Sequence, residues 1–306
     1  MSAIYQRVAL IGLGLIAGSM GLEMRAGGLA GEVVGTARSA RTRRVAAERG
    51  LADRVTATAA EAVAGADLVV LAVPVGAMGA VAAEIGPHLA PGTTVTDVGS
   101  VKRAVIRDVA PHLPDGVHFI PAHPLAGTEE TGPEAGLKGL FRGRWCLTLP
   151  LPGTEQAALD RLEELWQALG AHVGRMDPDH HDLVLAVTSH APHLIAYTMV
   201  GVADDLEQVT ESEVIKYSAA GFRDFTRIAA SDPTMWRDVF LANRDATLEI
   251  LGRFTEELFA LQRAIRQGDG EMLFDYFTRT RAIRRGIIEA GQDTPAPDFG
   301  RTPPPE

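Results

Sequence analysis

The sequence predicts an α/β protein in which an N-terminal doubly wound sheet is followed by an all-helical domain. Over residues 1–176, short apolar runs alternate with helical stretches, a pattern typical of a parallel sheet that helices cover on both faces. Strand signals end there, and only helical periodicity continues to about residue 290. We therefore expect a first domain over 1–176, a helical domain over 177–291 and a disordered tail over 292–306, where five prolines occur without an apolar period.

Each expected element follows from a short apolar or periodic segment. Strands are expected where apolar and β-branched residues cluster, over 8–11, 33–36, 67–73, 93–97, 118–120, 145–149 and 171–176. Helices are expected between them, over 16–26, 40–49, 76–85 and 155–169. In the second half, Leu248, Leu251, Leu258 and Leu261 recur at the spacing of one helix face.

Composition excludes several function classes. The net charge of -10 argues against nucleic-acid binding, which needs clustered basic side chains. Cys146 is the only cysteine, so an intrachain disulfide is impossible. No 18-residue run is uninterruptedly apolar, and the N-terminal apolar run breaks at Gly12 and Gly14 without a cleavage site. We therefore expect a cytoplasmic protein with neither a membrane span nor a signal peptide.

A glycine-rich turn follows the first expected strand. The segment 12–18, GLGLIAG, fits the G-x-G-x-x-G/A pattern of Rossmann dinucleotide-binding folds, and it has the required strand before it and helix after it. Gly12 permits the tight turn, Gly14 lets the backbone approach the pyrophosphate, and Ala17 permits close packing of helix on strand. With Leu15 and Ile16 at the start of the helix, these residues form the expected phosphate-binding site for NAD or NADP.

The end of the second strand leaves the cofactor preference open. NAD enzymes usually place an acidic residue there to bind the ribose hydroxyls, but this chain has Ala37 followed by Arg38 and Ser39. Arg38 could pair with the 2′-phosphate of NADP, or it could belong to a solvated helix face with the arginines that follow. Val73 and Pro74, at the end of the third strand, complete the expected cofactor-binding set.

Two polar segments follow strands and are expected near a substrate. In 97–102, DVGSVK, Ser100 lies at the carboxyl end of a strand, where open α/β sheets bind ligands, although it could equally cap a helix. In 123–129, HPLAGTE, His123 could act as a general base at neutral pH or be an ordinary surface histidine. The glycines from Gly127 to Gly143 indicate a mobile loop over a site.

Two further segments lie in the helical half. In 189–193, SHAPH, Ser189 and His193 are four residues apart and share a helix face. In 221–227, GFRDFTR, Arg223 and Arg227 have the same spacing and could together bind an anion, or form a surface ion-pair cluster with Asp224. The neighbouring segment 179–182, DHHD, matches no spacing of metal ligands, so no metal is expected.

Together these motifs resemble the prephenate/arogenate dehydrogenase (cyclohexadienyl dehydrogenase) family. The segments 12–19, 97–102, 123–129, 189–193 and 221–227 occur in the family's order, and the resemblance covers about residues 5–290. It implies a nucleotide-binding domain and a helical domain that forms a homodimer. It also implies oxidation at the ring C4 hydroxyl, hydride transfer to NAD or NADP and loss of the ring carboxylate as carbon dioxide, on the route to tyrosine.

The resemblance also implies roles for individual residues. His123 would accept the proton of the ring hydroxyl, and Ser100 would orient His123 or the substrate. Arg227, with Arg223 beside it, would hold a substrate carboxylate. The side chains expected to line the pocket are Ser189, His193, Thr128 and Glu129.

Two other interpretations remain at this stage. One is a different two-domain NAD(P)-dependent dehydrogenase, of the β-hydroxyacid or imine reductase type, because fold alone does not decide function. The other is a nucleotide-sensing protein without catalysis. Absorbance at 340 nm with prephenate, arogenate and a panel of hydroxyacids distinguishes all three.

Overall fold

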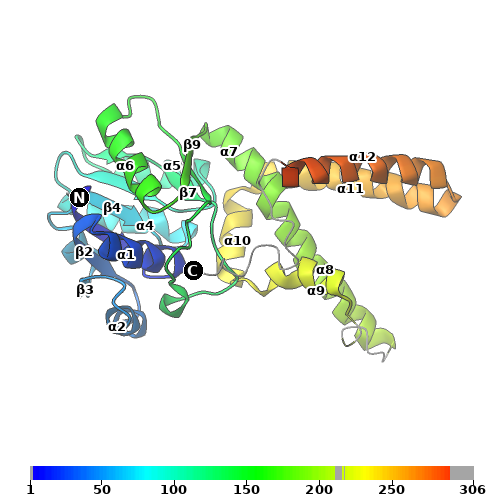
Figure 1. Ribbon diagram of the computed structural model, residues 1–306, viewed down its shortest axis with the longest axis horizontal. Helices are drawn as coiled ribbons and strands as arrows, with labels where there is room; N and C mark the ends of the chain where they lie inside the picture. The colour runs from blue at the N-terminus through cyan, green and yellow to red at the C-terminus, as the bar shows by residue number, and fades with distance from the viewer. Residues whose placement is uncertain (1–2, 211–215, 217, 290–306) are drawn as a thin grey trace. The chain divides into compact units, whose positions relative to one another are not determined.

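The computed structural model describes residues 3–210, 216 and 218–289 (Figure 1). The strands are β1 (Tyr5–Ile11), β2 (Ala30–Thr36), β3 (Arg54–Thr56), β4 (Leu68–Leu71), β5 (Thr94–Asp97), β6 (His118–Phe119), β7 (Ala122–Pro124), β8 (Trp145–Thr148) and β9 (His172–Arg175). The helices of the first half are α1 (Leu15–Gly27), α2 (Ala40–Glu48), α3 (Ala59–Val63), α4 (Val75–Ile85), α5 (Arg103–Val109) and α6 (Gln156–Ala168).

The second half of the described chain is helical, as predicted. Its α-helices are α7 (Pro178–Leu185), α8 (Ala191–Thr210), α9 (Ala220–Thr226), α10 (Pro233–Ala242), α11 (Arg244–Gln267) and α12 (Gly270–Glu289). A π-helical turn, Ala186–His190, joins α7 to α8, and a 3₁₀ turn, Arg227–Ala230, follows α9. The four leucines of the predicted repeat all lie in α11.

The main sheet has the strand order β3-β2-β1-β4-β5-β6, and all its strands are parallel. This is the order of a doubly wound dinucleotide-binding fold, and it brings the carboxyl ends of the strands to one edge. Along β1, Val8 and Leu10 are buried in one core cluster with α1 and α6, whereas Ala9 and Ile11 are buried in another with α3, α4 and α5. The prediction of a parallel sheet covered on both faces is therefore confirmed.

A second sheet, with the order β7-β8-β9, departs from the sequence prediction. Its strands β7 and β8 run antiparallel, with His123 opposite Leu147, whereas β8 and β9 are parallel. His123 therefore lies within a strand, and the expectation that it only follows one was wrong. The chain leaves the main sheet at Pro121, whose carbonyl accepts a hydrogen bond from the backbone N–H of Leu149, so β7 starts beside β8.

Packing divides the chain into one compact unit over Met1–Leu248 and a second over Glu249–Glu306. Within the first unit, Trp236 and Val239 of α10 are buried in the same core cluster as residues of α4 and α5. The predicted domain boundary after residue 176 stays a prediction, and the predicted disordered tail, 292–306, lies outside the described residues.

One helical run among the described residues, Pro178–Leu206, is long and apolar enough to cross a membrane by length and composition alone. Its most apolar window has a mean hydropathy of 1.4, and 28% of that window is buried. A single such run is weak evidence, because helices that pack against other protein have the same length and composition. The run also holds the buried side chains of His181, Asp182 and His190.

Candidate active site

The turn after β1 has the geometry that a dinucleotide requires. Gly12 has φ = 99°, and a Cβ there would lie 2.6 Å from the carbonyl oxygen of Ala72, so only glycine fits. Gly14 caps α1, and a Cβ there would meet no protein atom within 4 Å. Ala17 is fully buried against the sheet. The open space before the N-terminus of α1 therefore fits a pyrophosphate, whose negative charge the helix dipole stabilises.

The arginines after β2 differ in what they contact. Arg43 donates to the backbone carbonyls of Ala37 and Arg38, at 2.6 and 2.9 Å. Arg41 and Arg44 form exposed ion pairs with acidic side chains. The guanidinium of Arg38 is exposed, and within the described part of the chain it has no hydrogen bond or ion pair. Arg38 is thus the arginine of this segment that is available for a ligand.

Four other predicted ligand residues lie at the same carboxyl edge of the sheet. Val73 is half-buried and Pro74 exposed after β4. Ser39 follows β2, and its hydroxyl accepts a hydrogen bond from the backbone N–H of Thr42, which fixes the start of α2. Ser100 is half-buried after β5, and among the residues described here its hydroxyl makes no hydrogen bond to His123. Its predicted role, to orient His123 or the substrate, stays a prediction.

A buried ion pair fixes the position of β7. Lys102 and Asp97 are fully buried, and the Lys102 ammonium donates to the Asp97 carboxylate and to the carbonyl of Ala122. Asp97 also accepts a hydrogen bond from the backbone N–H of Gly99, at 2.8 Å. Burial lowers the pKa of Lys102, while the Asp97 charge opposes that shift. Because Asp97 also accepts a hydrogen bond from the backbone N–H of Ala122, both partners bind the residue directly before His123 and determine where the histidine lies.

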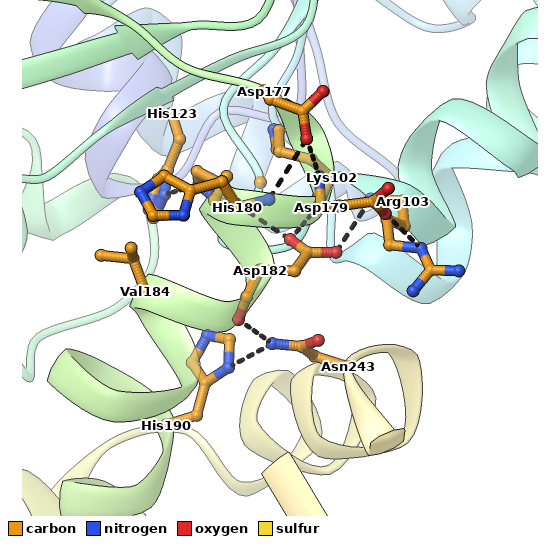
Figure 2. Close-up of polar contacts among 12 residues, drawn as sticks. Lys102, Arg103, His123, Asp177, Asp179, His180, Asp182, Val184, His190 and Asn243 are labelled. Carbon is orange, nitrogen blue, oxygen red and sulfur yellow. Dashed lines mark hydrogen bonds and ion pairs between the residues drawn. The ribbon is translucent and has the colours of Figure 1, made fainter. Parts of the chain in front are cut away.

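His123 belongs to a chain of buried polar side chains. Its Nδ1 lies 2.9 Å from Nε2 of His181, and Nδ1 of His181 lies 2.9 Å from Oδ1 of Asp182. Asp182 also accepts hydrogen bonds from the backbone N–H groups of Lys102 and Arg103, at 2.8 and 3.0 Å (Figure 2). In the sequence, the segment 179–182 was assessed only as a possible set of metal ligands. It did not identify this chain, because the burial of His181 and Asp182 depends on tertiary packing.

The protonation state of His123 follows from its surroundings. Burial lowers its pKa well below 6.5, and the charges that His181, Lys102 and His190 can carry lower it further. Burial likewise lowers the pKa of His190 to about 4, against the opposing effect of Asp182. His123 is therefore a neutral imidazole at pH 7, which is the state that a general base requires.

A pocket of about 410 Å³ opens beside His123. It holds six of the eight side chains for which the sequence predicted catalytic or substrate-binding roles, namely His123, Thr128, Glu129, Ser189, His193 and Arg227. Apolar side chains complete its wall, among them Leu185, Met235 and Trp236. His123 lines this pocket although the residue is only 8% exposed.

The two predicted anion-binding arginines are in different places. Helix α9 ends at Thr226, so Arg223 and Arg227 do not share one regular helix face. Arg227 lines the pocket, and its Nη1 lies 2.6 Å from Oε2 of Glu129. Arg223 is exposed and is not among the side chains that line the pocket. Among the described residues that line this pocket, Arg227 is thus the one with a permanently cationic side chain.

His193 is held in one orientation. Its Nδ1 donates to the backbone carbonyl of Ser189, at 2.8 Å, and its ring stacks on Trp236 with 3.7 Å between ring centroids. The Ser189 carbonyl accepts this bond where the π-helical turn meets α8. His193 therefore presents its unprotonated Nε2 as a hydrogen-bond acceptor.

The segment predicted as a mobile loop is bonded to the nucleotide-binding helices. The backbone N–H of Leu137 donates to the Ser19 hydroxyl, at 3.0 Å, and that of Gly139 donates to Glu23. Arg49 donates to the carbonyls of Pro133 and Gly136. These bonds attach the second half of the segment to α1 and to the end of α2.

Comparisons with known proteins agree on one family. The family model described as "Prephenate dehydrogenase, nucleotide-binding domain" matches residues 20–175, and "Prephenate dehydrogenase, dimerization domain" matches residues 177–279. The cyclohexadienyl dehydrogenase of Zymomonas mobilis is 39% identical over 284 residues, which cover 93% of this chain and 97% of the relative.

Solved structures give the same result. Prephenate dehydrogenase from Aquifex aeolicus, in complex with hydroxyphenyl propionate and NAD+, has a TM-score of 0.86 at 32% identity, covering 92% of this chain and 98% of its own. Arogenate dehydrogenase from Synechocystis has a TM-score of 0.76 at 25% identity, covering 92% and 100%. The resemblance thus spans both halves of the fold.

Proposed function

The chain belongs to the prephenate dehydrogenase family, and we propose that the pocket beside His123 is where it carries out that family's reaction. The protein is an NAD(P)-dependent oxidoreductase that oxidises and decarboxylates prephenate, arogenate or both. The products are 4-hydroxyphenylpyruvate from prephenate and tyrosine from arogenate, so the enzyme acts in tyrosine biosynthesis.

The observation that best supports the assignment of the pocket is the pairing of a neutral base with a cationic group. His123 is a buried imidazole that lines the cavity, and Arg227 lines the same cavity. A substrate that loses a hydroxyl proton and carries a carboxylate needs both groups: the base takes the proton, and the cation binds the carboxylate. The guanidinium of Arg227 binds the substrate carboxylate. It either leaves its present partner Glu129 or pairs with Glu129 and the substrate together.

His123 removes the proton from the C4 hydroxyl through Nε2. When bound, NAD(P) supplies the acceptor for the hydride that leaves C4. The electron pair of the hydroxyl O–H bond then forms the C4 carbonyl, and the bond from the ring to its carboxylate breaks to release carbon dioxide. The electrons of that bond aromatise the ring, and the resulting phenolate oxygen takes up a proton. Ser189, His193 and Thr128 provide polar contacts that orient the substrate.

The residues at the carboxyl edge of the main sheet would hold the cofactor. Gly12 and Gly14, at the start of α1, would bind its pyrophosphate. Arg38 and Ser39 would bind the adenosine ribose, where the exposed guanidinium could pair with a 2′-phosphate. Ser100, after β5, orients the nicotinamide or the substrate.

We also propose that the protein works as a cytoplasmic homodimer. The match to a dimerization domain supports this, as do the large apolar side chains of α11 and α12 that are exposed in the single chain. Leu258, Phe259, Phe274 and Phe277 are each more than half exposed. Such surfaces are usually covered by protein, and a second copy of the same chain is the partner that the family match indicates.

Initial rates with both substrates and both cofactors test the proposed function. Absorbance at 340 nm should rise with prephenate, arogenate or both, together with release of carbon dioxide. A panel of β-hydroxyacids, and of imines in the reverse direction, should give no comparable rate. Turnover of a β-hydroxyacid or an imine without turnover of prephenate or arogenate would contradict the proposal, and cofactor binding without any turnover would indicate a nucleotide sensor.

A further inference from the structure

We propose that His181 and Asp182 are positioning residues that hold His123 in the tautomer whose Nε2 is free to accept a proton. Neither residue lines the substrate pocket, and both act through the His123 ring. The inference rests on the proposed role of His123 as the base, and it adds the reason why that ring presents the correct nitrogen.

The carboxylate of Asp182 accepts hydrogen bonds and has no hydrogen to donate. Its Oδ1 accepts from the backbone N–H of Lys102, and its Oδ2 accepts from that of Arg103. Burial raises the pKa of this carboxyl, but the bond from His181 and the two backbone bonds more than offset burial and bring its pKa below the usual value. Asp182 is therefore an ionised carboxylate, and the ring nitrogen beside it must carry a hydrogen.

The hydrogen positions then follow along the chain of contacts. His181 donates from Nδ1 to Asp182, so the Nε2 of a neutral His181 has a lone pair. That nitrogen lies 2.9 Å from Nδ1 of His123, which must be the donor in this contact. With its hydrogen on Nδ1, neutral His123 has an unprotonated Nε2. Burial keeps the pKa of His181 below 6.5, although its bond to Asp182 opposes the shift, so the neutral form assumed here is the one present at pH 7.

The surroundings hold this arrangement in place. His181 is fully buried and Asp182 is 2% exposed, so water does not compete for their bonds. The backbone carbonyl of Asp182 accepts a hydrogen bond from Asn243, at 2.8 Å, and the same amide group contacts His190 (Figure 2). The backbone at the start of α5 thus holds the carboxylate of Asp182. Asn243, at the end of α10, holds the backbone of α7, the helix to which Asp182 belongs.

The same contacts help once His123 has taken up a proton. The imidazolium keeps its Nδ1–H on His181, and the negative charge of Asp182 lies beyond that ring to offset the new positive charge. The other titratable groups that face His123 are Lys102, before α5, and His190, in the π-helical turn, and both disfavour its protonation. Asp97 and Lys102 also act on His181, with opposite signs. Asp182 is therefore the anion best placed to support a protonated His123.

Nitrogen NMR of the histidine side chains tests the tautomer without relying on activity. In selectively labelled protein at neutral pH, the ring signals that disappear in His123→Asn identify His123. We expect those signals to show a protonated Nδ1 and an unprotonated Nε2, and we expect His181→Asn to abolish this pattern. A wild-type His123 that carries its hydrogen on Nε2, or a pattern that His181→Asn leaves unchanged, would overturn the proposal.

Two substitutions at His181 test the consequence for the reaction. A glutamine can place its amide oxygen near the position of the lost Nε2, where it still accepts from His123, whereas an asparagine is too short. We expect His181→Asn to lower kcat on the order of 10²-fold and to move the acid limb of the pH–rate profile to lower pH, because the protonated ring loses its acceptor. His181→Gln should stay within about fivefold of wild type, with KM for the cofactor unchanged in both variants.

The double variants separate this role from a structural one. If His181 acts only through His123, adding His181→Asn to His123→Asn should leave the residual rate unchanged. A further loss of similar size in that background, or wild-type kcat in His181→Asn alone, would refute the positioning role. Full activity in His123→Asn alone is a different result, because it would refute the proposed base itself.

Discussion

At the scale of single residues, Arg227 is the side chain whose removal should most affect substrate binding. Arg227→Ala should raise KM for the substrate about 30-fold or more, because losing a charge-assisted pair in a desolvated site costs on the order of 2–5 kcal/mol. Cofactor binding, followed by fluorescence titration, should stay unchanged. Arg244→Ala is the matched control, since that side chain is 71% exposed and lies outside the pocket. Unchanged KM and kcat in Arg227→Ala would remove it from the site.

Ala37 and Arg38 should determine which cofactor is used. The wild type should accept NADP, alone or together with NAD, because no acid binds the ribose and the Arg38 guanidinium is exposed. Ala37→Asp should shift kcat/KM towards NAD by adding a ribose hydrogen bond and repelling the 2′-phosphate. Arg38→Ala should lower kcat/KM for NADP alone, and Arg44→Ala, whose side chain pairs with Glu48, should change neither. Strong exclusion of NADP by the wild type would refute this account.

Much of the pocket could be predicted at this scale, because motif residues carry their chemistry in their identity. His123 and Arg227 were expected in one site, and the structure places both in one cavity. The role of His181 could not be predicted, because the meaning of a histidine next to an aspartate depends on what both contact. Whether Ser100 orients His123 or the substrate could not be predicted either, because position after a strand does not determine the direction of a side chain.

At the scale of elements, the buried pair of Lys102 and Asp97 should stabilise the attachment of β7. Lys102→Met leaves Asp97 buried without its partner, and breaking such a pair typically costs about 3–5 kcal/mol. Chemical denaturation should show a loss of this size, and adding Asp97→Leu should restore part of it because the uncompensated charge is removed. A loss below about 1 kcal/mol, like that expected for the exposed Arg107→Met, would contradict this prediction.

Most of the elements with a clear apolar run or helical period were predictable from the sequence. The long apolar strands and α11 were identified from their sequence patterns, whereas β3 and β7 have three residues each and are too short to show alternation. Strand β7 depends on pairing with β8 and on the bond from Lys102 to Ala122, both of which are contacts between segments distant in sequence. The end of α9 at Thr226 was not predicted either, because no proline or glycine directly follows it in the sequence.

At the scale of the whole molecule, association should follow from the exposed apolar helices of the second unit. Sedimentation equilibrium at micromolar concentration should give a species of twice the 32.5 kDa chain mass. Leu258→Asp should weaken this dimer, because it places a charge on a side chain that is 51% exposed in the single chain and covered in the proposed dimer. Glu257→Gln, at the adjacent position, is the matched control. A wild type that sediments only at 32.5 kDa would refute the proposed dimer.

The pH–rate profile of wild type and His123→Asn tests the central claim most directly. Asparagine keeps some hydrogen bonding but cannot accept the proton, so kcat should fall by roughly 10²–10⁴ while cofactor binding and Tm stay near wild type. In the wild type, kcat/KM should fall as the pH drops through the pKa of His123, which burial places below 6.5, because only the neutral ring can act as base. That acid limb should be absent from the variant. A His123→Asn enzyme with most of its activity and the same acid limb would contradict the account, and His193 would then be the next base to test.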